Sequence, residues 1–548
     1  MTSPTNSFHI ETFTPAEQDV LSRHFSNIDK PVFAIHSLPE VVKGALFARY
    51  SRSPKSVRRL FLDEFAEDAD TGTGAITDDT NNGDPVGMER AQSLYDRVFT
   101  QYGDDSVAQL GGAHLAVEQA SNILTKVLEW GRLASYLEQS TRYIFYDQHL
   151  GGRYRFHVPS ELDRTPERDR YVRELNELFD VYSRIVAKLV SYYEKLYPQA
   201  EGDSAFVWKA TIRARACDDA RGLLPAATTS NVGIFASGQA YEALLLRMAA
   251  HPLEEVRWYG DQMLFELRTV IPSFMKRVDV PDRGGTWARY FADIAKAMTD
   301  IGQTITDAPG GTHTVQLIHW DPEGERRVAA SALYPYVNMP DADLRALVDD
   351  MPESRIDEIF AAYVGDRTNR RHKPGRGLEE TFYRFDVLCD YGIFRDLQRH
   401  RMLTLDWQPL TPANGYVIPE SVIDIGAESA WRTAMDRMAV LHDELAVSAT
   451  PNVAQYVVPF AYRVRFYMNF NAREAFHMLE LRTQRGGHPD YRAVCQEMHR
   501  QIRDVAGHRR IADAMTFIDP NDYALGRLET ERRAAGKRAA LGIEDPSA

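Results

Sequence analysis

The feature that most constrains this chain is an internal repeat, because two copies of one sequence pattern predict two copies of one fold. Residues 33–50 and 316–334 both contain Ile-His, then Pro-Glu, then an Ala-rich run that ends in Tyr. Each segment predicts a short strand, a turn and a helix. The alternative is chance similarity between two helical segments.

Four further landmarks follow in the same order in both copies. They are an amphipathic helix, an arginine-bearing segment, a long helix, and a closing turn before a final helix that ends in Leu-Arg. Because five landmarks agree in order, the sequence predicts a tandem duplication that has diverged. The ranges are 107–128, 129–143, 166–196 and 220–225 with LLLRM in the first copy, and 378–397, 398–410, 427–447 and 454–459 with LELRT in the second.

The length of the chain requires more than one hydrophobic core. It has 548 residues, of which 44% are hydrophobic and 26% charged, an ordinary globular balance. Gly-rich sequence flanks a short helical stretch within 276–312, so we place a domain boundary there and expect domains at 1–285 and 286–548. The acidic, Gly/Thr-rich insert at 63–84 and the last residues, GIEDPSA, are expected to be disordered.

Charge and cysteine content exclude several classes of function. The formal net charge is −14, which argues against duplex nucleic acid as the main partner but allows a small phosphorylated ligand at a local arginine cluster. The cysteines, Cys217, Cys389 and Cys495, are far apart and predict neither a disulfide framework nor a metal site. The sequence shows no signal peptide and no membrane-spanning run, so a cytoplasmic protein is expected.

The first candidate site is Arg399-His400-Arg401, which ends the helix predicted over 378–397. Two guanidinium groups beside an imidazole suit a phosphate or the carbonyl edge of a heteroaromatic ring. The alternative is a solvated helix end, where basic side chains interact favourably with the helix dipole.

The second candidate site lies in LEQSTRY at 137–143. Ser140, Thr141 and Arg142 can bind a phosphate, and Glu138 can accept a hydrogen bond from a hydroxyl or a ring N–H. The alternative is a turn in which the two hydroxyl groups bond to the backbone.

The third candidate site lies in the last predicted helix of the second copy. If NFNAREAFHMLELRT is helical, Arg473 and His477 lie along one side, with Asn471 at its start. Arg482, further along the same helix, is either a surface charge or a fixed cation over a ligand.

Together these residues resemble the flavin-dependent thymidylate synthases. That family carries Arg-His-Arg, then Glu-x-Ser-x-Arg-Tyr, later Ala-Arg-x-x-Leu-Pro, and finally Asn-Ala-Arg followed by Leu-Arg. The resemblance covers most of the chain, once in each copy, but neither copy has the whole signature. The first copy keeps Ser135, Glu138, Ser140, Arg142, Tyr143 and Arg221, and the second keeps Arg399, His400, Arg401, Asn471, Arg473, His477 and Arg482.

The losses in the two copies are complementary. The first copy has Trp130-Gly131-Arg132 in place of Arg-His-Arg, and the second has Gln455 in place of Arg221. Random decay of a redundant copy would not respect this partition. The resemblance therefore implies one composite site built from both copies, and an abandoned mirror half-site at Arg132, Arg247 and Gln455.

The resemblance also implies roles for these residues in the reductive methylation of dUMP to dTMP. Methylenetetrahydrofolate and NADPH would be co-substrates, and Arg482 would polarise the uracil ring as the catalytic residue. The implied FAD-binding residues are Arg399, His400, Arg401, Asn471, Arg473 and His477, with Ser106 and Glu379 as remnants of a further family motif. The implied dUMP-binding residues are Glu138, Ser140, Thr141, Arg142, Arg221 and Arg482.

The implied architecture is α+β, with two tandem domains that each contain a small antiparallel sheet and long helices. Because the family is tetrameric, two fused domains predict a homodimer that forms a pseudo-tetramer. Asp396 stands where the family has Gln, and the loop after Arg401 is rebuilt. Two alternatives therefore stay open: a related flavoenzyme acting on another pyrimidine nucleotide or one-carbon donor, and an inactive scaffold that binds flavin or nucleotide.

Overall fold

The computed structural model describes residues 11–31, 33–38, 40, 42–43, 46–47, 53–66, 109–163, 165–201, 203–305 and 313–540. Ser106 and the predicted disordered segments at 67–84 and 542–548 lie outside these residues, as does much of the helix predicted before residue 50. Residues 63–66 of the acidic insert are described and belong to a π-helical turn, η1 (Leu62–Ala66). Of the strand predicted near residue 33, the structure shows one bridge, between Ile35 and Phe25.

Residue contacts divide the chain into two compact units. Unit 1 comprises Met1–Val117, Leu133–Leu137 and Val232–Ile305. Unit 2 comprises Glu118–Arg132, Glu138–Asn231 and Thr306–Ala548, so it contains residues of both sequence copies. The boundary between residues 285 and 286 stays a prediction of where one sequence copy ends and the next begins. The two compact units do not coincide with the two sequence copies.

Two small sheets share one strand order, which confirms the α+β fold class. The first sheet has the order β1-β3-β2, and the second has the order β4-β5-β7-β6 and is antiparallel throughout. In chain order and in sheet order, β1, β2 and β3 match β5, β6 and β7, as a tandem duplication requires. The strands are β1 (Gly112–Ser121), β2 (Ala134–Glu138), β3 (Thr229–Ser237), β4 (Val315–Trp320), β5 (Phe382–Asp390), β6 (Thr404–Trp407) and β7 (Arg463–Asn471).

The continuous helices predicted over 107–128 and 378–397 are wrong. In each copy a strand runs directly into a short helix, β1 into α7 (Asn122–Leu128) and β5 into α16 (Tyr391–Leu397). Tyr383, Phe385 and Val387 are buried at every second position of β5, the periodicity of a strand, and aromatic and β-branched residues favour strands. Each helix begins only after an N-cap, Ser121 or Asp390, whose side chain accepts a backbone hydrogen bond.

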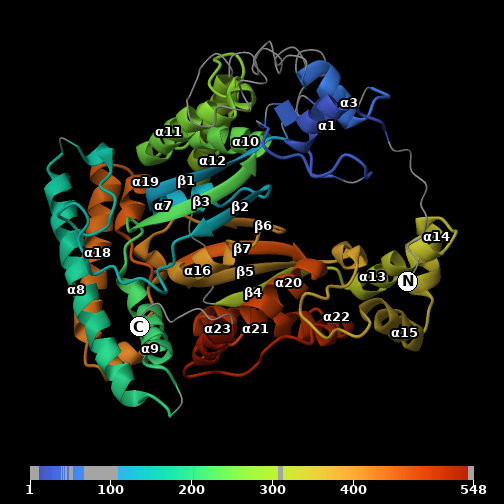
Figure 1. The fold of residues 1–548 in the computed structure, drawn as a ribbon. Helices are drawn as coiled ribbons and strands as arrows, with labels where there is room; N and C mark the ends of the chain where they lie inside the picture. The colour runs from blue at the N-terminus through green and yellow to red at the C-terminus, as the bar shows by residue number, and fades with distance from the viewer. Residues whose placement is uncertain are drawn as a thin grey trace. The chain divides into compact units, whose positions relative to one another are not determined.

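The two long helices predicted over 166–196 and 427–447 are confirmed. They are α8 (Glu167–Leu196) and α18 (Glu428–Ser448), which lie side by side in unit 2 (Figure 1). Both helices bury apolar side chains, among them Leu178 of α8 and Met438 of α18, and Arg437 of α18 forms an ion pair with Glu174 of α8.

The final helices of the two copies are α10 (Gly238–Ala249) and α20 (Ala472–Arg482). Each begins after an N-cap, Ser237 or Asn471, whose side chain accepts from the backbone three residues later. Counted from these caps, Arg482 corresponds to Met248 and not to Arg247. The Leu-Arg landmark of the first copy is therefore one residue out of register with that of the second, which a sequence pattern without caps could not reveal.

The closing turns of the two copies pair with each other inside unit 2. They are η4 (Arg221–Leu223) and η9 (Gln455–Val457), and Pro225 and Pro459 form an antiparallel bridge after them. Ala226 N donates to Val458 O and Phe460 N donates to Leu224 O, both at 2.9 Å. This exchange holds Arg221 of the first copy against the second copy.

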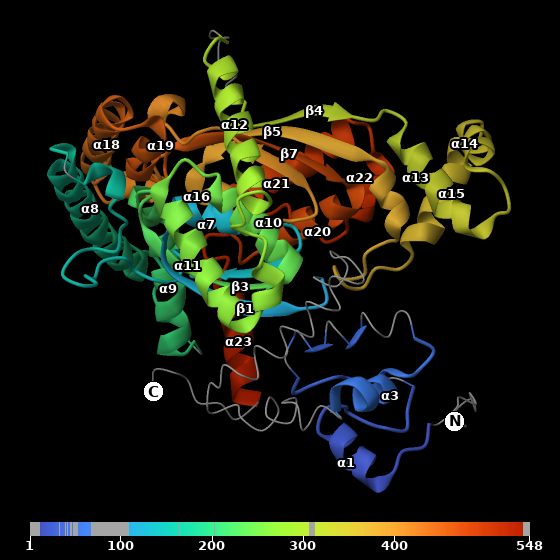
Figure 2. The same cartoon turned by 90° about the horizontal axis from the view of Figure 1, so that it is seen from above.

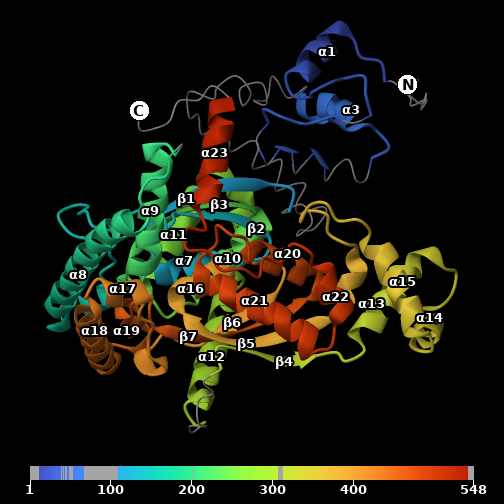
Figure 3. The same ribbon diagram turned by 90° about the horizontal axis from the view of Figure 1, so that it is seen from below.

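Helices cover the second sheet in unit 2. α20, α21 (Pro489–Asp504) and α22 (Arg509–Ala514) lie over one face (Figure 3), and α13 (Gly324–Leu333), α14 (Asp341–Asp349) and α15 (Glu353–Val364) cluster beyond β4 (Figure 2). Within the described ranges, no helix has the length and apolarity needed to cross a membrane. The other α-helices are α1 (Pro15–Ser22), α3 (Val57–Phe61), α9 (Ala205–Ala220), α11 (Glu254–Val270), α12 (Gly284–Gly302), α17 (Glu420–Asp424), α19 (Pro451–Ala454) and α23 (Leu528–Ala540).

Candidate functional site

Asp396 is the centre of a buried cationic cluster in unit 2. It lies near the end of α16 and is 4% exposed. One carboxylate oxygen accepts a hydrogen bond from Arg221 Nη1 at 3.3 Å. The other pairs with Arg399 Nη2 and lies 3.9 Å from Arg482 Nη1. Burial alone would raise the pKa of this carboxyl, but the surrounding guanidinium charges, that of Arg399 foremost, hold the pKa well below its usual range.

Asp218 is a second buried carboxylate that gathers arginines. It lies in α9, and Arg142 donates to its two oxygens from Nε at 2.7 Å and from Nη2 at 2.9 Å. Arg527 donates to it from Nη2 at 3.2 Å. Burial opposes ionisation, but the charges of Arg142 and Arg527 lower the pKa of Asp218, so it stays a carboxylate.

Tyr491 of α21 joins the two clusters. Its hydroxyl accepts from Arg142 Nη1 at 3.2 Å, and the guanidinium carbon of Arg482 lies 5.4 Å from its ring centroid. Five arginines of both sequence copies therefore lie at these two carboxylates, so the direct ion pairs include more positive than negative groups. Such a local excess of positive charge favours an anionic ligand.

Arg221 provides a specific sign that an acceptor belongs here. The residue is 3% exposed, and its Nη2 has no hydrogen-bond partner among the described residues. Leaving a buried donor without an acceptor costs about 1–3 kcal/mol, and more for a charged group. A phosphate oxygen is an acceptor that this guanidinium can bind.

The predicted ligand-binding group Glu138 takes part in a buried ion network. It accepts from Arg395 Nη2 at 2.7 Å and lies 3.3 Å from Lys126 Nζ, which is 2.5 Å from Glu129. Burial would raise the pKa of Glu138, but Arg395 and Lys126 lower it, whereas burial raises the pKa of Glu129. Both oxygens of Glu138 are thus bonded to cations of this chain.

The two hydroxyl groups of the second candidate site also have partners within the chain. Thr141 Oγ1 accepts from Arg395 Nη1 at 3.2 Å, and Ser140 Oγ accepts from the backbone N of Arg142 at 3.2 Å. The turn alternative therefore describes Ser140, while Thr141 is bonded to an arginine of the second copy. A direct role of either hydroxyl in binding a phosphate stays a prediction.

His400 is buried, so the solvated-helix alternative does not describe it. Arg482 Nε donates to His400 Nε2 at 2.9 Å, and His400 Nδ1 lies 3.1 Å from Glu474 Oε1. Because Nε2 accepts, Nδ1 carries the proton and donates to the carboxylate. Burial, with the charge of Arg482, lowers the pKa of His400 to about 4, so the imidazole is neutral at pH 7.

His400, Glu474 and His477 together offer metal-ligand atoms within 4.8 Å of one another. His477 Nδ1 lies 3.2 Å from the second oxygen of Glu474. Burial would raise the pKa of Glu474, but hydrogen bonds from the two histidines lower it to about 2. The Arg482 cation beside His400 opposes a metal ion at this place by like-charge repulsion, and the three side chains instead form a hydrogen-bonded chain that positions Arg482.

The remaining predicted cofactor residues lie near α20. Asn471 Oδ1 caps the helix by accepting from Glu474 N at 2.9 Å. Arg473 donates to Pro374 O at 3.3 Å and lies 3.4 Å from Glu379, so two predicted cofactor residues meet. Arg401 is half-buried and has no hydrogen bond or ion pair within the part of the chain that the structure describes.

Sequence reasoning missed four residues of this site: Asp218, Arg395, Tyr491 and Arg527. Two of them had a detectable signal, since Asp218 lies almost one helical turn before Arg221 and Arg395 one turn before Arg399. Tyr491 and Arg527 are brought to the site by α21 and by the segment before α23, and no motif precedes either.

Comparison with known proteins places the chain in a family. The model of the thymidylate synthase complementing protein family matches residues 47–273 and 316–507. A UPF0159 protein of Chlamydia pneumoniae is 38% identical over 532 residues, covering 95% of this chain and 98% of that protein. One of Thermoplasma acidophilum is 30% identical over 531 residues, covering 91% and 99%.

Two solved structures show weaker similarity. A UMP/dUMP methylase PolB from Streptomyces cacaoi, bound with 5-Br dUMP, is 18% identical and covers 37% of this chain and 95% of its own, with a TM-score of 0.30. The flavin-dependent thymidylate synthase ThyX from Helicobacter pylori, complexed with FAD and dUMP, is 14% identical and covers 34% and 92%, with a TM-score of 0.26. The family match spans both sequence copies, and the chain belongs to the thymidylate synthase complementing protein family.

Proposed function

We propose that this protein is a flavin-dependent thymidylate synthase of the cytoplasm that methylates dUMP to dTMP at one composite site. Methylenetetrahydrofolate would supply the carbon and NADPH the reducing equivalents. The observation that carries the proposal is the convergence of five arginines from both sequence copies on two buried carboxylates. Family membership supports the reaction class.

Arg142, Arg221 and Arg482 would bind the nucleotide. Asp218 and Asp396 hold these side chains in place without ligand, so little side-chain entropy is lost when a phosphate binds. The unpartnered Nη2 of Arg221 offers a donor for a phosphate oxygen. Glu138 and Thr141 both bond to Arg395 and would act chiefly by holding that side chain in place. Ser140 would shape the turn that carries Arg142.

Arg482 would be the residue that activates the pyrimidine. Its Nε is fixed by His400, which Glu474 fixes in turn, so the Nη groups keep one direction. A neutral His400 accepts from Arg482 without adding a second positive charge. A positioned guanidinium would favour negative charge on the uracil carbonyls as it develops.

The cationic donors on the second copy fit a flavin. The half-buried, unpartnered guanidinium of Arg401 and the remaining amide donor of Asn471 would hold FAD, together with Arg399, His400, Arg473 and His477. Reduced FAD, when bound there, would supply the hydride that converts the methylene group transferred to the nucleotide into a methyl group. Glu379, which holds Arg473, would act through that arginine, and the role of Ser106 stays a prediction.

We also propose a homodimer that forms a pseudo-tetramer. In unit 1, the helix α12 carries large apolar side chains that are exposed in the single chain, among them Trp287, Ile294 and Met298. An apolar helix face of this size is a feature of interaction surfaces. Light scattering of the purified protein should give twice the mass of one chain, and a monomer would contradict the proposal.

A second candidate function is favoured by Asp396. This ionised carboxylate lies among the arginines predicted to bind the nucleotide, in a position where the family has an uncharged Gln. Methylation of another pyrimidine nucleotide, such as UMP or dCMP, follows if Asp396 selects a different sugar or base. Nucleotide-dependent oxidation of the reduced flavin, compared across dUMP, UMP and dCMP, separates the two, and a strict dUMP preference removes the second.

The decisive experiment is growth of a thymidine auxotroph that expresses this chain. The chain should rescue growth, and Arg142→Ala and Arg399→Ala should each abolish rescue because each removes one copy's contribution to the composite site. Arg132→Ala, in the mirror half-site, is the matched control and should leave rescue intact. Rescue that persists without Arg399 would contradict the composite site, and a purified protein that cannot take up FAD would favour an inactive scaffold.

A further inference from the structure

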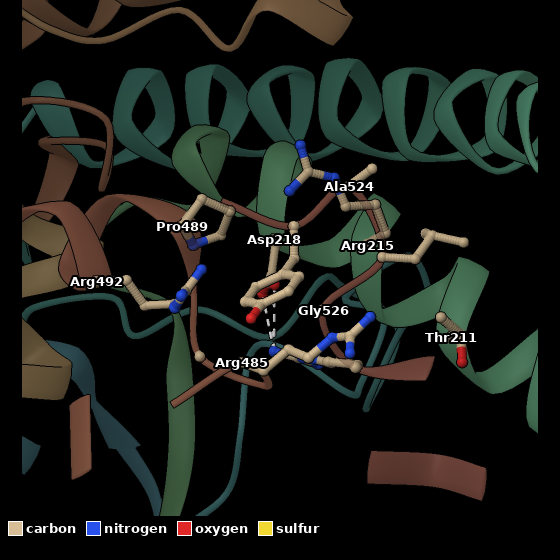
Figure 4. Close-up of a pocket in the computed structure, with 12 residues that line it drawn as sticks. Thr211, Arg215, Asp218, Arg485, Pro489, Arg492, Ala524 and Gly526 are labelled. Atoms are coloured by element: carbon tan, nitrogen blue, oxygen red, sulfur yellow. Dashed lines mark hydrogen bonds and ion pairs between the residues drawn. The ribbon is translucent and has the colours of Figure 1, made fainter. Parts of the chain in front are cut away.

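A second cationic pocket lies in unit 2, and four of its twelve lining residues are arginines (Figure 4). Arg215 comes from α9, Arg485 follows α20, Arg492 lies in α21 and Arg527 precedes α23. Asp218 contributes the single carboxylate among the lining residues that the structure describes. The pocket shares Asp218 and Arg527 with the composite site, whereas Arg215, Arg485 and Arg492 belong to the pocket alone.

The arginines of this pocket are only loosely paired with carboxylates. Arg215 lies 3.5 Å from Asp219, Arg485 lies 3.8 Å from Glu529, and Arg492 lies 3.7 Å from Asp519. These separations are long for charge-assisted hydrogen bonds, which measure about 2.7–2.9 Å. Arg492 is fixed by hydrogen bonds from Nε to Thr483 O at 2.9 Å and from Nη2 to Asn521 O at 2.6 Å, whereas Arg485 can turn its N–H groups toward a ligand without breaking a strong bond.

Arg527 supplies an independent sign of a missing acceptor. The residue is 7% exposed, and its Nε has no hydrogen-bond partner among the described residues. Its Nη1 donates to Arg142 O at 3.2 Å and its Nη2 to Asp218, so the side chain is fixed in one orientation. A buried charged donor in this state is expected to have an acceptor, and an anion oxygen can serve.

The pocket is built in part by sequence outside the region that the family model matches, which ends at residue 507. Tyr523 lies with its ring centroid 4.3 Å from the guanidinium carbon of Arg485 and 5.0 Å from that of Arg492. Gly526 makes this close approach possible, because a Cβ there would lie 2.1 Å from Arg485 O. The C-terminal segment thus holds the arginines in place. Tyr523 is the one aromatic residue among the described lining residues, and two guanidinium groups already contact its ring, so a base has no free ring to stack on.

We infer that this pocket binds a phosphate group, at a place separate from the composite site. Guanidinium groups bind phosphate through paired N–H donors, and four of them converge here. The source is either free inorganic phosphate or the phosphate of a nucleotide. The inference does not depend on the proposed function, because binding alone tests it.

The test is equilibrium dialysis of labelled inorganic phosphate with the full-length protein. Arg485→Ala should weaken phosphate binding about tenfold, the effect of one lost charge-assisted hydrogen bond or more, with partial recovery in Arg485→Lys. Arg485 is largely exposed and carries no backbone hydrogen bond, so this variant should fold, and a melting curve checks that. Arg500→Ala, an exposed arginine of α21 that pairs with Glu497, is the matched control and should bind like the wild type.

A second arm repeats the dialysis with saturating dUMP. Phosphate that still binds, together with an Arg485→Ala variant that keeps its dUMP affinity, supports a separate pocket for free phosphate. Displacement of phosphate by an excess of NADPH but not of dUMP supports the nucleotide as the source. No phosphate binding up to about 10 mM, or complete competition by dUMP with both affinities reduced in Arg485→Ala, overturns the inference. Failure of the proposed function would appear instead as absent dUMP binding with phosphate binding intact.

Discussion

The turn after α16 and the turn after α7 have the same place in their repeats but opposite chemistry. After α16, Arg399 pairs with Asp396, and His400 bonds to Glu474 and Arg482. After α7, Trp130 Nε1 donates to Leu405 O at 3.2 Å and Arg132 Nη2 donates to Thr404 Oγ1 at 3.2 Å. The turn after α16 bonds to buried charged side chains, and the turn after α7 bonds to a strand of the second sheet.

The closing turns show the same contrast. Arg221 bonds to a buried carboxylate and keeps an unpartnered donor, whereas Gln455, in its place in the second copy, accepts from the backbone N of Leu410 at 3.0 Å. Buried ion pairs carry a large desolvation cost and are often no more stabilising than neutral side chains. The Gln455 side therefore shows what the fold alone requires, and the Arg221 side shows a charge cluster kept for another reason.

The largest effect that tests this contrast is Asp218→Ala against Asn452→Ala, its counterpart in the second copy. Asp218→Ala leaves Arg142 and Arg527 buried without their carboxylate, so it should lower the free energy of unfolding by about 3–5 kcal/mol. Asn452 Oδ1 accepts only a long hydrogen bond, from Gln455 Nε2 at 3.5 Å. Asn452→Ala should therefore lower the free energy of unfolding by under about 1 kcal/mol. Urea denaturation of both variants measures the difference, and equal losses would contradict the asymmetry.

The sequence could indicate the residues of the proposed composite site because their motifs are local. Arg399 to Arg401, Asn471 to Arg473 and Glu138 to Arg142 each lie within five consecutive residues, and their split between copies indicated which halves meet. The partners of these residues could not be predicted so well. Tyr491 reaches the site only through the packing of α21, and Arg527 only through a segment outside the family match.

The strands β1 and β5, which lie inside the two wrongly predicted helices, could not be predicted for a related reason. The three- and four-residue spacing of apolar residues across β5 and α16 combines one strand and one helix, and it imitates a single longer helix. The N-cap at Asp390 separates the two elements, and β7 supplies the hydrogen bonds that make Phe382–Asp390 a strand. Pairing over such a sequence distance leaves no local signal.

The second prediction concerns pH and the buried imidazole in the turn after α16. His400 has an ordinary pKa near 6.5 when unfolded and about 4 when folded, because burial and Arg482 oppose its protonation. The unfolded chain therefore binds more protons between these values, so stability is full above pH 6.5 and falls as the pH is lowered toward 4, by up to about 3 kcal/mol. Gly131, at the same place in the first copy, has no titratable side chain.

Unfolding of the wild type and of His400→Asn, followed from pH 7.5 to 4.0, measures this effect. The variant should be less stable at pH 7 but should lose less stability on acidification. A variant with the wild-type pH slope would show that other groups, such as the buried His488, whose pKa burial lowers to about 3, account for the acid sensitivity.

The smallest effect is expected at Trp130, in the turn after α7. Trp130→Phe keeps an aromatic ring but removes the hydrogen bond to Leu405 O, so the free energy of unfolding should fall by about 1 kcal/mol. Growth rescue and dUMP binding should not change, because the residue has no part in the charge cluster. A loss of rescue in a variant that melts within a few degrees of the wild type would mean that the mirror half-site still contributes to function, and the contrast between the two turns would then be one of degree.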